Sequence, residues 1–213
     1  MSVVGIVPAA GRGERLGAGS PKAFVVCGGR PLIEWSLDVL RDACDRVVVA
    51  VPPGEESGPD QVAGGASRSE SVRAALAAAP EATVAVVHDA ARPLITRGLV
   101  DRCVAEVRAG WDGAVAAAPM TDTVKEAGDD GGVVRTLDRS RLWRIQTPQV
   151  FAADVLRRAL DADAAVLAAA TDDSSLVEAA GGRVRVVEAP PENIKVTRPV
   201  DLALAEALLG DRA

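Results

Sequence analysis

The chain has 213 residues, of which 48% are hydrophobic and 2% aromatic, and this length fits one α/β domain whose core must be built from Val, Leu, Ile and Ala. A formal net charge of −6 and the shortage of aromatic stacking platforms argue against a nucleic-acid partner. Three cysteines without a C-x-x-C spacing and a single histidine argue against a disulfide framework, a zinc site or a His-rich metal site.

In chain order, the first half of the sequence alternates apolar runs with helical patterns. Strands are predicted at residues 2–7, 47–51, 83–87 and 114–118. Helices are predicted at 31–40 with Pro31 at the first helical position, from a cap at Ser67 or Ser69 to residue 79, and from a cap at Thr96 to residue 108. Strands that are apolar throughout and alternate with helices are typical of a parallel sheet covered on both faces.

Residues 121–149 interrupt this alternation. Segments 123–126 and 133–137 flank the turn sequence DDGG at 129–132, a pattern typical of a β-hairpin inserted into an α/β chain. Helices are then predicted at about 153–160 and 175–180, a strand at 184–187 and a closing helix at 199–209. We therefore expect a single domain over residues 1–213 with an inserted β-arm at about 120–143.

The loop after the first predicted strand has the composition of a phosphate-binding loop. It reads PAAGRGERLG over residues 8–17 and continues to Lys22. Small residues let backbone N–H groups approach an anion, and Arg15 and Lys22 add two cations. The pattern G-x-x-x-x-G-K-[ST] is absent, and G-x-G-x-x-G fails because Gly17 comes one residue late. The loop therefore favours phosphate binding over a dinucleotide site or a flexible turn.

The motif HDAARP at residues 88–93 follows the third predicted strand. Ligands of open α/β sheets bind at the carboxyl ends of strands. Asp89 could therefore hold Mg²⁺ against a triphosphate, or it could cap a turn and pair with Arg92. We interpret His88 as a residue packed at the strand end and not as a base.

Two further motifs leave a functional and an ordinary interpretation open. In GGASRSESV at residues 64–72, Gly65 and Ser71 could contact a base or ribose, or the segment could be a common loop and helix cap. In NIKVTRP at residues 193–199, Lys195 could be a third cation of the site, or it could be a solvated lysine.

Taken together, these motifs resemble the 2-C-methyl-D-erythritol 4-phosphate cytidylyltransferase family. The resemblance runs from Pro8 to about Leu209 and covers the first loop and segments 65–72, 88–93, 122–123, 138–139, 142–143, 147–149, 171–173 and 193–198. It implies a Rossmann-like nucleotidyltransferase fold, with a mostly parallel central sheet covered by helices and a protruding β-hairpin dimerisation arm. It also implies a homodimer, Mg²⁺ as the divalent cation, and transfer of CMP from CTP to 2-C-methyl-D-erythritol 4-phosphate.

The resemblance assigns roles to individual positions. Residues that would hold CTP are Ala9, Ala10, Gly11, Gly13, Gly65, Ser71 and Ala90. Asp89 would serve the metal, and Arg15, Lys22 and Lys195 would surround the reacting phosphates. Thr123, Arg139 and Thr171 would hold the methylerythritol phosphate, while Arg92 and Thr147 would line the site. Family members often carry an acidic residue where this chain has Ala66, so one polar contact near the nucleotide is not carried over.

Two alternatives remain open at this point. Cytidylyltransferases for ribitol 5-phosphate or another sugar phosphate share the fold and the first loop, and a non-catalytic nucleotide-binding regulator would keep the fold. No apolar run approaches the roughly 20 residues of a membrane span, and no basic segment precedes the first strand. We therefore expect a cytoplasmic protein without a membrane partner.

Overall fold

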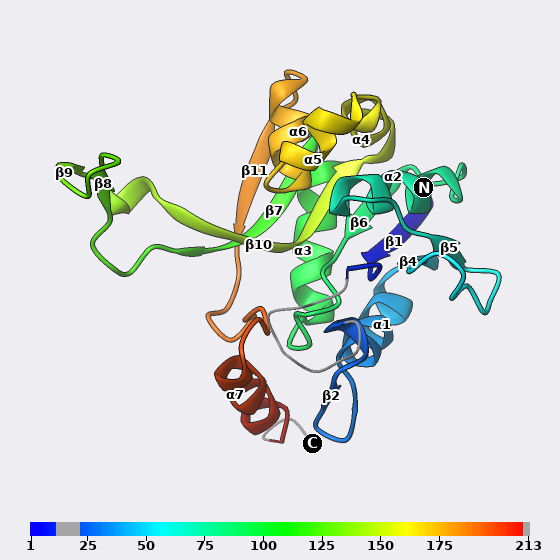
Figure 1. The fold of residues 1–213 in the computed structure, drawn as a ribbon. Helices are drawn as coiled ribbons and strands as arrows, with labels where there is room; N and C mark the ends of the chain where they lie inside the picture. Colours follow the sequence, from blue (N-terminus) through cyan, green and yellow to red (C-terminus); the bar gives the residue numbers. More distant parts are fainter. Residues whose placement is uncertain (12–21, 211–213) are drawn as a thin grey trace.

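A seven-stranded sheet forms the centre of the chain in the computed structural model, which describes residues 1–11 and 22–210 (Figure 1). The strand order is β11 (Val184–Glu188), β7 (Gly113–Pro119), β10 (Trp143–Ala152), β6 (Val84–Val87), β1 (Val3–Pro8), β4 (Arg46–Val51) and β5 (Gln61–Ala63). The pairs of β1 with β4 and β6, of β4 with β5, and of β7 with β11 are all parallel. The mostly parallel sheet predicted from the sequence is confirmed.

Strand β10 is the exception, and the sequence patterns did not predict it. It runs antiparallel between β6 and β7, with Gln149 opposite Val87 and Val115. Its first three residues are exposed, and its pairing with β7 shifts register between Ile145 and Gln149, around Pro148, which cannot donate a ladder hydrogen bond. Because the strand is polar at first and interrupted by proline, it lacks the continuous apolar run by which β1, β4, β6 and β7 were predicted.

Helices cover both faces of the sheet, as predicted. The elements α1 (Leu32–Ala43) and α3 (Arg97–Arg108) lie on one face, and α2 (Arg68–Ala77), α4 (Ala153–Leu160), α5 (Ala164–Ala169) and α6 (Asp173–Ala179) lie on the other (Figure 1). Adjacent strand residues enter opposite cores: Val7 packs with α1 and α3, and Ile6 packs with α2 and α4. Among the described residues, Phe151 is the only aromatic residue of the buried apolar core.

Two helices, α2 and α3, start at capping residues that the sequence indicated. Ser67 caps α2 in a capping box, in which its hydroxyl accepts from Glu70 N at 3.2 Å and the Glu70 carboxylate accepts from Ser67 N at 2.8 Å. Thr96 caps α3 by accepting from Leu99 N at 3.4 Å. Pro31 is the residue before α1 and not its first helical residue, a one-position correction to the prediction.

A third apolar cluster lies beyond the sheet. The helix α7 (Pro199–Gly210) packs there with the short hairpin of β2 (Val26–Cys27) and β3 (Arg30–Pro31), burying Cys27, Leu32 and Val196. The sequence predicted α7 but not this hairpin, nor the short elements β5 and α5. Each of them has six residues or fewer, which is too short for a periodic pattern to show.

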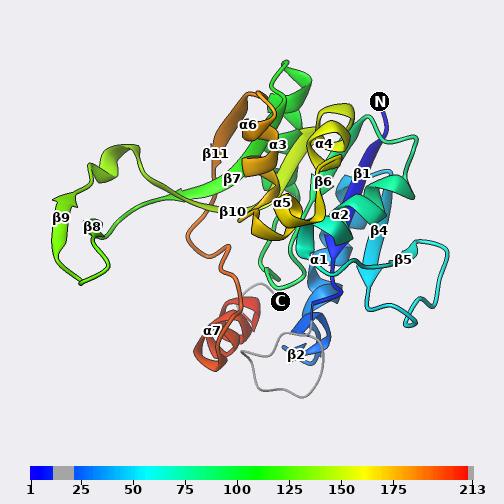
Figure 2. The ribbon, with the colours of Figure 1, turned by 45° about the horizontal axis from the view of Figure 1, so that its top comes forward.

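The predicted hairpin is present as β8 (Lys125–Ala127) and β9 (Val133–Thr136), and it extends away from the sheet in both views (Figures 1 and 2). Every residue of both strands is exposed, and Val133 and Val134 retain 63% and 65% of their accessible surface. A two-stranded hairpin is marginal in water unless it packs on something. The arm therefore presents apolar surface without a core of its own.

Within the described ranges, no helix combines the length and the apolarity that crossing a lipid bilayer requires.

Candidate active site

Two adjoining cavities lie where β1 and β6 end, the edge at which open α/β sheets bind ligands. The first has a volume of about 300 Å³ and is lined from the end of β1, from the loop before α2 and from the loop after β6. The second has a volume of about 450 Å³ and is lined by β10 and by the segment that begins α6. Three residues line both cavities: Arg68, Asp89 and Lys195.

The wall of the first cavity needs glycine because the backbone packs closely there. A Cβ atom on Gly64 would lie 2.3 Å from the Cβ of Ala10, and one on Gly65 would lie 2.3 Å from the Cβ of Glu70. The Gly65 N–H donates to Ser71 Oγ at 3.1 Å, and that hydroxyl donates to the Ser67 carbonyl at 3.0 Å. The hydroxyl of Ser71 therefore orders the glycine loop, and its remaining lone pair can still accept from a ligand.

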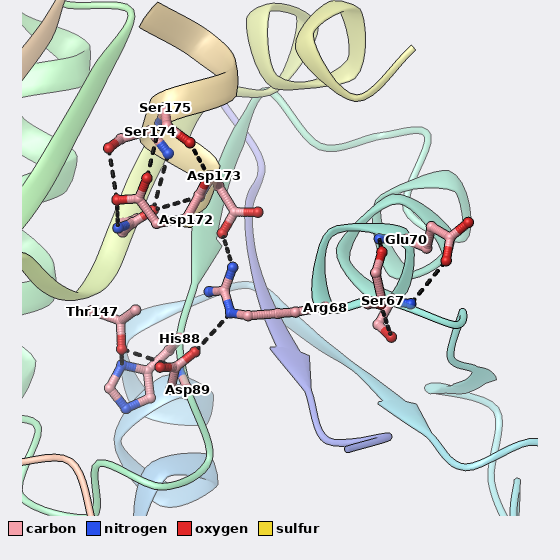
Figure 3. Close-up of polar contacts among 12 residues, drawn as sticks. Ser67, Arg68, Glu70, His88, Asp89, Thr147, Asp172, Asp173, Ser174 and Ser175 are labelled. Carbon is pink, nitrogen blue, oxygen red and sulfur yellow. Dashed lines mark hydrogen bonds and ion pairs between the residues drawn. The ribbon is translucent and has the colours of Figure 1, made fainter. Parts of the chain in front are cut away.

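A charged cluster joins the two cavities (Figure 3). Asp89 Oδ2 accepts a hydrogen bond from Lys195 Nζ at 2.6 Å, and Asp89 Oδ1 accepts one from Arg68 Nε at 3.0 Å. Burial by itself raises the pKa of the Asp89 carboxyl, but Arg68 and Lys195 outweigh it and hold that pKa below its usual range. Asp89 is therefore a carboxylate at any physiological pH, held between two cations.

Arg68 also reaches a second carboxylate. Its Nη1 donates to Asp173 Oδ2 at 2.6 Å (Figure 3), and Asp173 is fully buried. The Asp173 and Ser174 N–H groups both donate to Gln149 Oε1 at 3.2 Å, and Gln149 Nε2 donates to Asp172 Oδ2 at 2.7 Å. This network fixes the start of α6 against β10.

His88 belongs to a buried hydrogen-bond chain with Asp89 and Thr147, which line the second cavity. The Asp89 N–H donates to Thr147 Oγ1 at 3.1 Å, so the Thr147 hydroxyl is available to donate to His88 Nδ1, also 3.1 Å away. His88 Nε2 then donates to the Arg92 carbonyl at 3.2 Å. Burial lowers the pKa of His88 to about 4, so the ring is neutral at pH 7. This agrees with the packing role expected for it.

Amide groups hold another part of the second cavity wall. Asn193 Nδ2 donates to Gln146 Oε1 at 2.7 Å and to the Thr147 carbonyl at 2.9 Å. Arg92 Nη1 donates to the Asn193 carbonyl at 2.7 Å, while its buried Nε has no hydrogen-bond partner among the described residues. The guanidinium of Arg92 thus lines the second cavity with hydrogen-bonding capacity to spare.

Comparison with known proteins identifies the family. A family model described as 2-C-methyl-D-erythritol 4-phosphate cytidylyltransferase (IspD) matches residues 3–211. A relative of that name from Nocardia farcinica is 49% identical over 224 residues, which cover 100% of this chain and 96% of the relative. The crystal structure of the enzyme of that name from Thermus thermophilus has a TM-score of 0.83 and 39% identity, covering 99% of this chain and 100% of that one.

The chain belongs to the 2-C-methyl-D-erythritol 4-phosphate cytidylyltransferase family. It is a nucleotidyltransferase that transfers CMP from CTP to 2-C-methyl-D-erythritol 4-phosphate, giving 4-diphosphocytidyl-2-C-methyl-D-erythritol and pyrophosphate in isoprenoid biosynthesis. The Francisella tularensis structure of the same name, at 28% identity, has a TM-score of 0.81 over 97% of this chain and 99% of that one. The fold predicted from the resemblance is confirmed.

The structure brings most of the predicted cytidylyltransferase residues to the two cavities. The first cavity is lined by Ala9, Ala10, Gly11, Lys22, Gly65, Ser71, Asp89, Ala90 and Lys195. The second is lined by Arg92, Thr147 and Thr171. Gly13 and Arg15 lie outside the described residues. Thr123 and Arg139 are exposed on the arm and line neither cavity of their own chain.

The sequence motifs did not single out Arg68 and Asp173, although both lie inside matched segments. One local signal was present. Arg68 is the first residue of α2, directly after the cap, and the helix dipole disfavours a cation at that position. A basic residue at a helix start beside a glycine loop is therefore worth testing for a role outside the helix. Asp173 offers no such signal, because an acidic residue in a first helical turn is common.

The side chains of the first cavity could hold a divalent cation only together with phosphate oxygens of a substrate. Within the described residues, no three His, Cys, Asp or Glu side chains converge, and Asp89 is the only acidic residue on the first cavity wall. Mg²⁺ at nucleotide sites is usually held by one or two carboxylates together with substrate phosphates. The residues fit a metal that arrives with the triphosphate, and they do not fit a resident metal centre.

Proposed function

We propose that the cytidylyltransferase binds CTP in the first cavity and 2-C-methyl-D-erythritol 4-phosphate in the second. The observation that carries this division is the wall that the cavities share at Arg68, Asp89 and Lys195. A phosphate oxygen of one substrate must reach the α-phosphorus of the other, so the two substrates have to meet at one point. The shared wall is accessible from both cavities. The glycine loop lies on the first side only, and Thr171 lies on the second side only.

In this arrangement the first cavity holds the nucleotide by its backbone and its small residues. Ala9, Ala10, Gly11, Gly13, Gly65, Ser71 and Ala90 would hold CTP. Lys22 and Lys195, together with Arg15, would neutralise the phosphates, because both reactants are anions that otherwise repel each other. Positioning and charge neutralisation supply most of the catalysis in such a reaction.

The second cavity would bind the alcohol phosphate through Arg92, Thr147 and Thr171. A phosphate oxygen of this substrate attacks the α-phosphorus of CTP, the new P–O bond forms, and the bond to pyrophosphate breaks. A phosphate monoester is already ionised near neutral pH, so no side chain has to remove a proton. The neutral, hydrogen-bonded His88 is consistent with a reaction that needs no histidine base.

Mg²⁺ would be held by Asp89 together with the nucleotide phosphates. When bound, the ion would neutralise charge on the triphosphate and on the departing pyrophosphate. Both oxygens of Asp89 already accept from cations, so a metal would replace or share one of these contacts. Lys195 and Arg68 then keep the local positive charge directed at the phosphates.

The arm of a second copy of the chain would supply the remaining residues of the second cavity. Thr123 and Arg139 lie on an exposed arm that buries none of its own strand residues. A two-fold dimer in which each arm crosses to its partner would bury this apolar surface and build two equivalent shared sites. We place this dimer in the cytoplasm, where the substrates of a soluble biosynthetic step are found.

The direct test is pyrophosphate release by the purified chain. We expect release only when CTP, Mg²⁺ and 2-C-methyl-D-erythritol 4-phosphate are all present, with little release when ribitol 5-phosphate replaces the methylerythritol phosphate. Equilibrium dialysis with each substrate alone then tests the division of the cavities, because CTP should bind in the absence of the alcohol phosphate. Equal turnover of both alcohol phosphates would contradict the proposed fit of the second cavity.

A further inference from the structure

Arg68 is a cation common to both cavities, and two acids hold it in place (Figure 3). We propose that Arg68 is a further catalytic residue of cytidylyl transfer, contacting the reacting phosphates from between the two cavities, and that Asp173 is the residue that positions it. This rests on the proposed division of the two substrates between the cavities. Arg68 Nε contacts Asp89 at 3.0 Å, and its Nη1 contacts Asp173 at 2.6 Å.

The location argues for contact with the reacting centre. Of the three residues on the shared wall, Asp89 is an anion, so only Arg68 and Lys195 can stabilise negative charge there. Lys195 is a point charge on a flexible stem with one carboxylate partner, and its side chain is 39% exposed. Arg68 is a planar donor fork held at two points, so its direction is fixed before substrates arrive.

The guanidinium keeps donor capacity after both acids are satisfied. It carries five N–H groups, and the hydrogen bonds to Asp89 and Asp173 use two of its three nitrogens. No hydrogen bond joins Nη2 to any described residue. In Figure 3 this nitrogen points between the two carboxylates, toward the side of Thr147 and Asp172, which line the second cavity. Its N–H groups are therefore available to a phosphate oxygen.

Asp173 has the features of a positioning residue. It is fully buried, it lines neither cavity, and its Oδ1 has no hydrogen-bond partner among the described residues. Burying a carboxylate is costly, and apolar replacement of a buried ion pair is often neutral or stabilising. The dipole of α2 also disfavours Arg68 at the helix start. A buried ion pair is therefore weak evidence of a role in stability, and the orientation of Arg68 accounts for the buried carboxylate directly.

The test is a double-mutant cycle on kcat with Asp173→Asn and Arg68→Lys. Lysine keeps the charge but cannot contact both acids as a fork. Arg46→Lys is a matched control, because Arg46 also joins two carboxylates, Asp60 at 2.7 Å and Glu81 at 3.0 Å, and lines neither substrate cavity. Thermal unfolding of each variant, and its KM for CTP, establish that it is folded.

We expect Asp173→Asn to lower kcat on the order of 10- to 100-fold, as misplacement of a reacting group does, while both KM values change by less than about threefold. In the Arg68→Lys background the same substitution should lower kcat by less than about threefold, because Asp173 acts through Arg68. Arg46→Lys should keep the kcat of the unaltered chain.

Two results would overturn the proposal. One is an Asp173→Asn variant that is folded and keeps its kcat. The other is a double variant whose loss is the product of the two single losses, as independent structural effects would give. The division of the cavities is tested separately by Thr171→Val: if that variant loses affinity for the alcohol phosphate as expected while Asp173→Asn keeps its kcat, only the role of Arg68 fails.

Discussion

Lys22 begins the helical turn Lys22–Phe24 and lines the first cavity. If Lys22 stabilises the negative charge that develops on the α-phosphate, Lys22→Ala should cost about 3–4 kcal/mol of transition-state stabilisation. This corresponds to a kcat that is lower by a factor of a few hundred or more. The KM for CTP should change much less, because ground-state binding has many other contacts. Steady-state kinetics over a range of CTP concentrations measure both quantities, and a variant that keeps most of its turnover would remove Lys22 from the mechanism.

Thr171 lies on the wall of the second cavity, away from the glycine loop. Thr171→Val keeps the shape of the side chain and removes its hydroxyl. A hydrogen bond to a charged group is worth roughly 1.5–3 kcal/mol, so we expect the KM for the alcohol phosphate to rise about tenfold or more while CTP binding stays nearly intact. Loss of CTP affinity instead would show that the substrates are not divided as proposed.

At the scale of single residues, motif and resemblance located most of the cavity walls but not the way the charges are arranged. Lys195 could be predicted as a third cation, yet its contact with Asp89 depends on two segments 106 residues apart in sequence. The burial of Asp173 likewise appears only when α6 packs on β10. Long-range pairing of this kind has no local pattern, so the sequence could not supply it.

Among the secondary-structure elements, those with a sustained period or a capping residue were predictable, and β10 was not. Helix α2 shows why the caps are informative, since Ser67 and Glu70 satisfy each other's backbone N–H groups in the structure. The course of β10 depends on its neighbours β6 and β7. Its polar, proline-interrupted sequence is stabilised by pairing on both sides and not by its own propensity.

The cap of α2 should serve both the helix and the glycine loop. We expect Ser67→Ala to lower the free energy of unfolding by about 1 kcal/mol. It should also raise the KM for CTP, because fraying of the uncapped helix start would displace the Ser67 carbonyl, which alanine retains and which accepts from the Ser71 hydroxyl that orders Gly65. Urea unfolding and CTP kinetics measure the two effects. Thr96→Ala is the matched control: it removes the cap of α3, which lines neither cavity, so it should lower stability and leave the KM for CTP unchanged.

At the scale of the whole molecule, the exposed arm predicts that each site contains residues of two chains. The test mixes the inactive variants Lys22→Ala and Arg139→Ala after the dimers are dissociated and allowed to reassociate. If Arg139 acts in the partner's site, each mixed dimer has one intact site, and with half of the dimers mixed the activity should return to about a quarter of the unaltered level. If Arg139 acts in its own chain, every site keeps a lesion, so confirmed exchange without recovery would contradict the crossing.

The stability of the molecule should depend on the protonation of His88. Its pKa of about 4 in the folded state lies below the unfolded value of about 6.5, so the unfolded chain binds the extra proton between these values. The contribution of His88 is therefore fully present above about pH 6.5 and is lost as the pH falls toward 4, by up to about 3 kcal/mol. Burial raises the pKa of Asp173 against the opposing charge of Arg68. Protonation of Asp173 therefore changes the stability in the opposite direction over part of this range.

The histidine contribution can be isolated with His88→Asn, which removes the titrating ring. Urea unfolding of both proteins across pH 4–7 should give a smaller dependence on pH for the variant. Identical pH dependence in the two proteins would show that His88 is not buried as a neutral ring.

The scarcity of aromatic residues also gives the molecule a spectroscopic reporter at the base of the arm. The chain has three tryptophans and no tyrosine, and the tryptophans have different surroundings. Trp35 packs beneath Arg30, Trp111 lies beside Arg183 and Arg185, and Trp143 begins β10 at the base of the arm with 36% of its surface exposed. With phenylalanine at the other two positions, ultraviolet emission would come from Trp143 alone. Its emission maximum would then depend on the solvent exposure of the base of the arm. A shift of that maximum on dilution of the protein would report dissociation of a dimer without any attached dye.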